Sequence, residues 1–140
     1  MGQALRASVY RQAAIARLAE AEYLKRAYPS GAIYLGGYVV ECMLKWAICQ
    51  RHGVIYFENL SNPKLAAQLM SARGHDLGFL LDASGLRPLR KSNKLLYNAF
   101  TEVSGWSVAL RYNPSTGDVR VAARFMDGVN ALRVWLEGIC

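Results

Sequence analysis

Two charged side chains, Glu41 and Lys45, stand inside an otherwise apolar stretch, GGYVVECMLKWAICQRHG at residues 36–53. On a helix their i, i+4 spacing, with the acid first, favours an ion pair. If the pair faces solvent, it contributes about 0.3–0.5 kcal/mol. If Glu41 is buried, it needs a further partner such as His75 or Arg111, because an unpaired interior carboxylate is costly. We predict a structural role for both residues. An arrangement in which both side chains converge with a histidine in an open cleft would contradict this prediction.

His75 is followed directly by Asp76, a pairing that also occurs in metal sites. The chain holds two histidines and no pair of them at helical spacing, so we expect no catalytic metal. Asp76 precedes the apolar run LGFLLDAS and is placed to cap a short helix. The glycine-rich phosphate loops GxGxxG and GxxxxGK are absent from the sequence. We therefore expect His75 and Asp76 to be structural, and we expect no metal and no cofactor.

The segment RPLRKSNKL places four cations at spacings of three, one and three residues. If the segment is helical, these cations gather on one side, as in a strip that contacts phosphates. A solvated basic face is the alternative. The whole chain carries 17 Lys and Arg against 10 Asp and Glu, a net charge of +7 that favours polyanionic partners such as RNA or nucleotides. The predicted phosphate contacts are Arg87, Arg90, Lys91, Lys94 and Arg111.

Long helical segments must position these residues. Apolar side chains recur at three and four along residues 3–28 and again along 122–139, which predicts two amphipathic helices. Between them, residues 31–52 are apolar almost all round, with Gly53 placed to end the helix in a left-handed cap. A helix of this kind lies in the middle of a bundle.

Shorter elements fill the interval between the long helices. Asn62 and Asp76 are placed to cap two short helices. A longer helical segment is predicted at residues 88–103. The side chains expected on its inner side are Leu89, Leu95, Leu96, Ala99, Phe100 and Val103. We expect residues 106–121, WSVALRYNPSTGDVRV, to cross the bundle in an extended conformation, and a small hairpin is the alternative.

The predicted fold is all-α: an up-and-down bundle of four to five helices in a single domain at residues 1–140. Residues 1–28 carry seven charges and no apolar core of a signal peptide. The longest uncharged run, residues 27–40, is too short to cross a bilayer. We expect a cytoplasmic protein without membrane contact. Its cysteines should then be free thiols in a reducing compartment. They are Cys42, Cys49 and Cys140.

Three separated stretches, YLGGYVVECMLKWAI, GHDLGFLL and GWSVALRY, resemble the motifs of the HEPN family, named for higher eukaryotes and prokaryotes nucleotide-binding. The likeness lies in a Gly-Tyr helix carrying Glu-Cys-x-Leu-Lys, a later His-Asp-Leu, and a Trp leading to Arg-Tyr. It implies an all-α bundle of four or five helices that commonly dimerises and handles RNA or nucleotides, often in toxin–antitoxin or phage-defence systems. Within these motifs, we expect Tyr38 and Tyr112 to be structural.

Many members of that family are ribonucleases that use an Arg and a His four to six residues apart, near the start of the last helix. Arg111 matches the Arg position, but Thr116, Gly117 and Asp118 stand where the His would be. Histidine is the side chain best suited to exchanging protons near neutral pH. We therefore predict no ribonuclease activity of the usual kind.

These observations predict a non-catalytic module that binds RNA, a nucleotide or a protein partner, and that forms a homodimer. One alternative is a ribonuclease toxin with a rearranged site built from Arg111, His75 and Glu41. Another is the assembly partner of a nucleotidyltransferase. Trp135 lies off the apolar line of the last helix and is the predicted interface residue.

Overall fold

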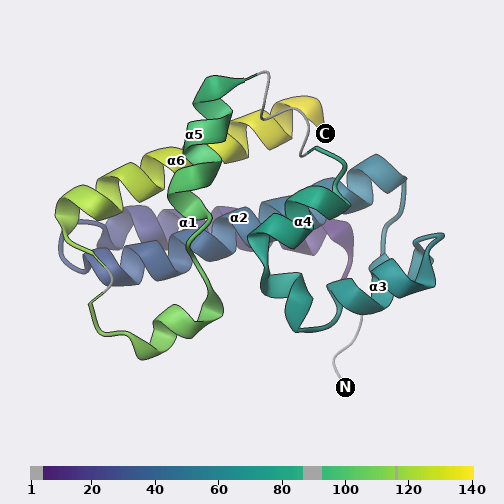
Figure 1. Ribbon diagram of the computed structural model, residues 1–140, viewed down its shortest axis with the longest axis horizontal. Helices are drawn as coiled ribbons and strands as arrows, with labels where there is room; N and C mark the ends of the chain where they lie inside the picture. The colour runs from purple at the N-terminus through teal and green to yellow at the C-terminus, as the bar shows by residue number, and fades with distance from the viewer. Residues whose placement is uncertain (1–4, 87–92, 116) are drawn as a thin grey trace.

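The computed structural model describes residues 5–86, 93–115 and 117–140, which contain helices and irregular segments but no strand (Figure 1). The predicted all-α class is confirmed. In these residues four α-helices have ten or more residues, and two have seven. The short helices lie in the connections between the long ones.

The central element is α2 (Pro29–His52), and more than half of its residues are buried. Pro29 occupies the first turn, where a missing amide hydrogen costs nothing. Gly53 ends the helix in the left-handed conformation, with φ of 66°, as predicted. Because α2 is apolar almost all round, its neighbours enclose it, and this places Glu41 and Lys45 in the interior.

The first helix, α1 (Ala7–Leu24), packs alongside α2 (Figure 1). Its buried face carries Tyr10, Ala14 and Ala21, and the small alanines let the two helices approach closely. The helix is shorter than predicted, because residues 25–27 form a turn before α2.

The segment after α2 consists of short helices with polar caps. The first is the 3₁₀ helix η1 (Phe57–Asn59), followed by α3 (Pro63–Leu69) and a second 3₁₀ helix, η2 (Ala72–His75). The helix α4 (Leu77–Ala83) follows directly and packs on α2. Asn62 caps α3 and Asp76 caps α4, as predicted.

The last two α-helices cross each other. Figure 1 shows α5 (Lys94–Val103) running steeply across α6 (Val119–Ile139), which also packs on α2. The crossing is close, because a Cβ at Gly128 of α6 would lie 3.0 Å from the carbonyl oxygen of Ala99. This crossing differs from a simple up-and-down arrangement.

The connection between α5 and α6 differs from the prediction. Residues 106–121 were expected to be extended, with a hairpin as the alternative, but the described part contains the 3₁₀ helix η4 (Val108–Tyr112) and the start of α6. Of the side chains predicted to face inward on α5, Leu95 does not, because it is 73% exposed. The predicted inward residues that are buried are Leu96, Ala99, Phe100 and Val103, and Leu89 lies outside the described residues. The cap at Asn93 fixes the start of α5 and sets which side chains face α6.

One described stretch, Pro29–Asn59, is long and apolar enough by length and composition to cross a membrane. It extends beyond the uncharged run at residues 27–40 and includes the charged residues Glu41 and Lys45. Of its most apolar window, 72% is buried inside the fold. The core helix of a bundle has the same composition.

Candidate functional site: a groove beside a buried Glu–Lys–His cluster

Glu41 is the centre of a cluster of ionisable side chains on α2. Lys45 Nζ lies 3.1 Å from its Oε2 atom, and His75 Nδ1 lies 2.8 Å from its Oε1 atom. The side chains of Glu41 and Lys45 are 5% and 10% exposed, whereas that of His75 is 45% exposed. The predicted ion pair is therefore present and buried, and His75 rather than Arg111 supplies its further partner.

A close approach between two backbone segments holds His75 above α2. A Cβ at Gly74 would overlap the carbonyl of Leu69 at the end of α3, so only glycine fits at position 74. On the other side of His75, the Asp76 side chain accepts a hydrogen bond of 3.0 Å from the Phe79 amide and opens α4. These two constraints fix the backbone on both sides of the histidine.

A second segment is fixed to α2 by Trp106, which follows α5 and is 5% exposed. Its indole nitrogen donates a hydrogen bond of 2.9 Å to the Tyr34 carbonyl oxygen. The indole also meets the Tyr38 ring edge-on, with ring centroids 4.9 Å apart. Gly37 makes this contact possible, because a Cβ there would overlap the indole.

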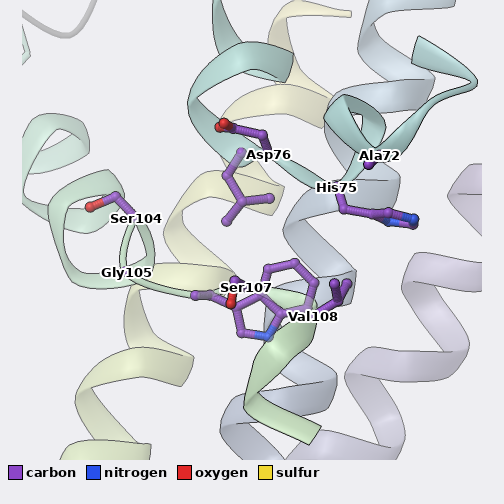
Figure 2. Close-up of a pocket in the computed structure, with 9 residues that line it drawn as sticks. Ala72, His75, Asp76, Ser104, Gly105, Ser107 and Val108 are labelled. Atoms are coloured by element: carbon purple, nitrogen blue, oxygen red, sulfur yellow. The ribbon is translucent and has the colours of Figure 1, made fainter. Parts of the chain in front are cut away.

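A groove of about 410 Å³ lies between these two fixed segments (Figure 2). One side is formed by residues 72–77 and the other by residues 104–108. Its volume falls in the range of about 300–1,000 Å³ that is typical of small-molecule sites. Figure 2 shows His75 towards one end and Ser104 towards the other. The lining residues are Ala72, His75, Asp76, Leu77, Ser104, Gly105, Trp106, Ser107 and Val108.

Arg111 lies on η4, the helix that begins at the groove with Val108. Its guanidinium carbon is 4.8 Å from the centre of the Tyr112 ring, which is 75% exposed. Tyr112 was expected to be structural, but it lies at the surface beside this cation. Burial raises the pKa of Tyr38 to about 12, assisted by Tyr34 and Glu41, while the positive charge of Arg111 acts in the opposite direction.

Of the predicted basic strip, only Lys94 lies within the residues that the structure describes. Arg87, Arg90 and Lys91 lie outside the described residues, and Lys94 is the first residue of α5. The groove begins only after the last residue of α5, and a helix of that length spans about 15 Å. Lys94 and Arg111 are therefore separate candidates for phosphate contact.

The Glu41–His75 pair can do acid–base chemistry. With Glu41 ionised, the hydrogen on His75 Nδ1 is donated to the carboxylate, which fixes the ring and leaves Nε2 for a ligand. Glu41 contacts this histidine, which lines an open groove, whereas Lys45 contacts Glu41, and neither charge lines the groove itself. A structural role for Glu41 and Lys45 stays a prediction.

One further predicted residue lies apart from the groove. Trp135, the predicted interface residue, is partly buried against the core. Among the residues that the structure describes, no group of three or more His, Cys, Asp or Glu could hold a metal ion.

The three cysteines are free. Burial raises the pKa of the Cys42 and Cys49 thiols to about 11 and also raises that of Cys140. Thiols of this kind stay protonated near neutral pH and are poor nucleophiles.

Sequence reasoning missed the serines of the groove and the glycines that shape it. Ser107 follows Trp106 in the stretch GWSVALRY and Ser104 directly precedes that stretch, but nothing in their spacing marks a site. Gly37 and Gly74 lie within the two other motifs, where only the packing against Trp106 and Leu69 shows why glycine is needed. Comparison of the chain with models of known families, with curated proteins and with solved structures found no match.

Proposed function

We propose that this protein is an RNA- or nucleotide-binding module with a HEPN-like helical bundle, and that it binds its ligand at the groove and along η4. The observation that carries this proposal is the exposed Arg111–Tyr112 stack next to the groove. A guanidinium binds phosphate through paired hydrogen bonds, and an exposed ring offers a face for a base. The net charge of +7 adds attraction to a polyanion.

The arrangement of the three resembling stretches supports the HEPN-like assignment. They are far apart in the chain, yet each contributes to one place: α2 supplies Glu41, η2 supplies His75, and the segment after α5 supplies Trp106 and Arg111. Convergence of separate motifs at a groove is what a shared binding site requires. A homodimer, a toxin–antitoxin or defence role and a nucleotidyltransferase partner stay predictions from the resemblance.

Fluorescence anisotropy with a labelled single-stranded RNA tests the binding proposal. We expect Arg111→Ala to weaken binding about 5- to 100-fold and to reduce the salt slope by roughly one counterion. Arg6→Ala removes the same charge from an exposed arginine at the start of α1 and serves as the matched control. Equal binding by wild type and Arg111→Ala would contradict the proposal.

A second function, metal-independent RNA cleavage, is favoured by the Glu41–His75 pair alone. In this reaction His75 Nε2 takes the proton of a ribose 2′-hydroxyl, and the oxygen attacks the adjacent phosphorus. The bond to the 5′-oxygen breaks, the imidazolium returns the proton to that oxygen, and a 2′,3′-cyclic phosphate remains. Arg111 would balance the charge that develops on the phosphate.

Incubation with total RNA in the presence of a chelator separates the two functions. The binding module leaves the RNA intact. The enzyme yields fragments ending in cyclic phosphate, and His75→Asn and Arg111→Ala abolish them. If both variants still cleave RNA, the cleavage comes from a contaminant, and His75 and Arg111 do not form a ribonuclease site.

A further inference from the structure

The two ends of the groove differ in their chemistry. Figure 2 shows the His75 ring and the Asp76 carboxylate directed to opposite sides, with Ser104 beyond Asp76. The His75 end leads through Val108 to η4, which carries the cation Arg111. The Asp76 end carries hydrogen-bond acceptors. A ligand with different groups at its two ends would bind in one orientation.

The hydrogen-bond acceptors at the Asp76 end can each accept a further hydrogen bond. Asp76 uses Oδ1 for the Phe79 amide, and no described residue hydrogen-bonds to its other carboxylate oxygen. The Ser104 hydroxyl donates to the Thr101 carbonyl oxygen at 3.0 Å, which leaves its own oxygen able to accept. The Ser107 hydroxyl has no hydrogen-bond partner in the described part of the chain. A hydrogen-bond donor on the ligand suits this end.

The His75 end of the groove is held rigidly. His75 is fixed through Nδ1 by a carboxylate that Lys45 also holds, so its Nε2 keeps one direction. When the ring is protonated, Nε2–H can donate to an anionic oxygen. Leu77, Trp106 and Val108 also line the groove and add apolar atoms to its wall.

We propose that the groove binds one nucleotide unit in a fixed orientation, with its phosphate at the His75 end and a hydrogen-bond donor at Asp76. This inference rests on the proposed nucleotide or RNA binding and adds which end of the ligand each residue recognises. The donor is either an exocyclic amine of the base or the ribose 2′-hydroxyl. Both present N–H or O–H to the carboxylate.

Calorimetric titration with CMP, UMP and dCMP identifies the donor. CMP has an amine where UMP has a carbonyl, and it has the 2′-hydroxyl that dCMP lacks. If the amine is recognised, CMP binds about tenfold more tightly than UMP. If the ribose hydroxyl is recognised, CMP and UMP bind equally and about tenfold more tightly than dCMP. A tenfold change corresponds to about 1.4 kcal/mol.

The variant Asp76→Asn tests the residue without removing the helix cap. Asn caps helices as well as Asp, but its amide replaces one acceptor oxygen by a donor. We expect this variant to lose the discrimination between the nucleotides. Asp118→Asn is the matched control, because Asp118 caps α6 through a 2.9 Å hydrogen bond from the Val121 amide and does not line the groove.

Equal affinity for all three nucleotides, or discrimination that survives Asp76→Asn, would overturn the inference. RNA binding that depends on Arg111 without any nucleotide binding would overturn it while leaving the proposed function intact. If the protein binds neither RNA nor a nucleotide, both the inference and the proposed function are contradicted. Retained discrimination in Asp118→Asn is required for the inference to stand.

Discussion

At the scale of single residues, Glu41 connects the interior of the protein to the groove. One carboxylate oxygen neutralises the buried Lys45, and the other holds a histidine that reaches solvent. A buried ion pair is not by itself a large source of stability, because both charges lose their water. Its use here is to fix the position of His75, which is what a binding or acid–base site needs.

Removal of one member of the cluster should be far costlier than removal of an exposed pair. Glu41→Gln leaves Lys45 buried without its counter-charge, and we expect the free energy of unfolding to fall by about 3–5 kcal/mol. Urea denaturation followed by circular dichroism measures the change.

Glu20→Gln is the control for this experiment. It breaks the Arg17–Glu20 pair, whose side chains are 40% and 46% exposed, and the expected loss is at most about 1 kcal/mol. Adding Lys45→Met to Glu41→Gln should restore part of the stability, since no unpaired charge is then buried. Equal small losses for Glu41→Gln and Glu20→Gln would show that the cluster is solvated.

The sequence predicted only part of the Glu41–Lys45–His75 cluster. The i, i+4 spacing correctly predicted the Glu41–Lys45 pair, because that contact is local to one helix. His75 was one of two candidate partners, and the choice between it and Arg111 depended on where η2 lies relative to α2. The contact joins residues 34 positions apart and cannot be read from spacing.

At the scale of elements, the groove exists because two connecting segments are anchored on the same helix. One anchor is Trp106, which packs on Gly37 and Tyr38 of α2 and bonds to the Tyr34 carbonyl. The other is the η2–α4 junction, which Glu41 holds through His75. If either anchor is lost, the two walls of the groove move independently.

Gly37→Ala tests the Trp106 anchor. The added methyl group would overlap the indole, so the ring must leave its position and give up its hydrogen bond to Tyr34. We expect destabilisation of about 1–3 kcal/mol from overpacking, a change in the near-ultraviolet dichroism, and weaker RNA binding.

Gly138→Ala provides the comparison. No atom lies within 4 Å of a Cβ at that position on α6, and Ala is favoured over Gly in helices by roughly 0.5–1 kcal/mol. Stabilisation is therefore expected there. If Gly37→Ala were tolerated equally well, Trp106 would not be anchored as described.

Elements set by local signals were predictable, and those set by packing were not. The caps at Asn62, Asp76 and Gly53 each depend on a side chain or a backbone preference within a few residues. The 3₁₀ helix at Val108–Tyr112 has no such signal, because it lies where Trp106 brings the chain back to α2. The exposure of Leu95 likewise follows from how α5 crosses α6.

At the scale of the whole molecule, burial of tyrosine hydroxyls makes stability sensitive to high pH. Burial raises the pKa of Tyr10 from 10.0 to about 12, with smaller contributions from Cys49, Cys42 and Glu41. The unfolded chain therefore loses this proton at lower pH than the folded protein. The free energy of unfolding should fall as the pH rises from 10 towards about 12.

Tyr10→Phe tests this dependence and keeps the ring that stacks on Phe57 at 5.3 Å. We expect the variant to lose less stability than wild type between pH 10 and about 12, measured by urea denaturation at several pH values. Tyr23→Phe is the control, because that ring is 87% exposed. If the free energy of unfolding falls equally with pH in wild type and Tyr10→Phe, the Tyr10 hydroxyl is not buried and protonated as described.

The central claim for the whole molecule is that nucleic acid binds at the groove and η4, and amide chemical-shift mapping tests it most directly. A ¹⁵N-labelled sample is titrated with a short single-stranded RNA at moderate salt. The account predicts saturable shifts at residues 72–77 and 104–112, with smaller changes at Glu41 and Lys45. Shifts confined to other surfaces, or no shift at millimolar RNA, would contradict it.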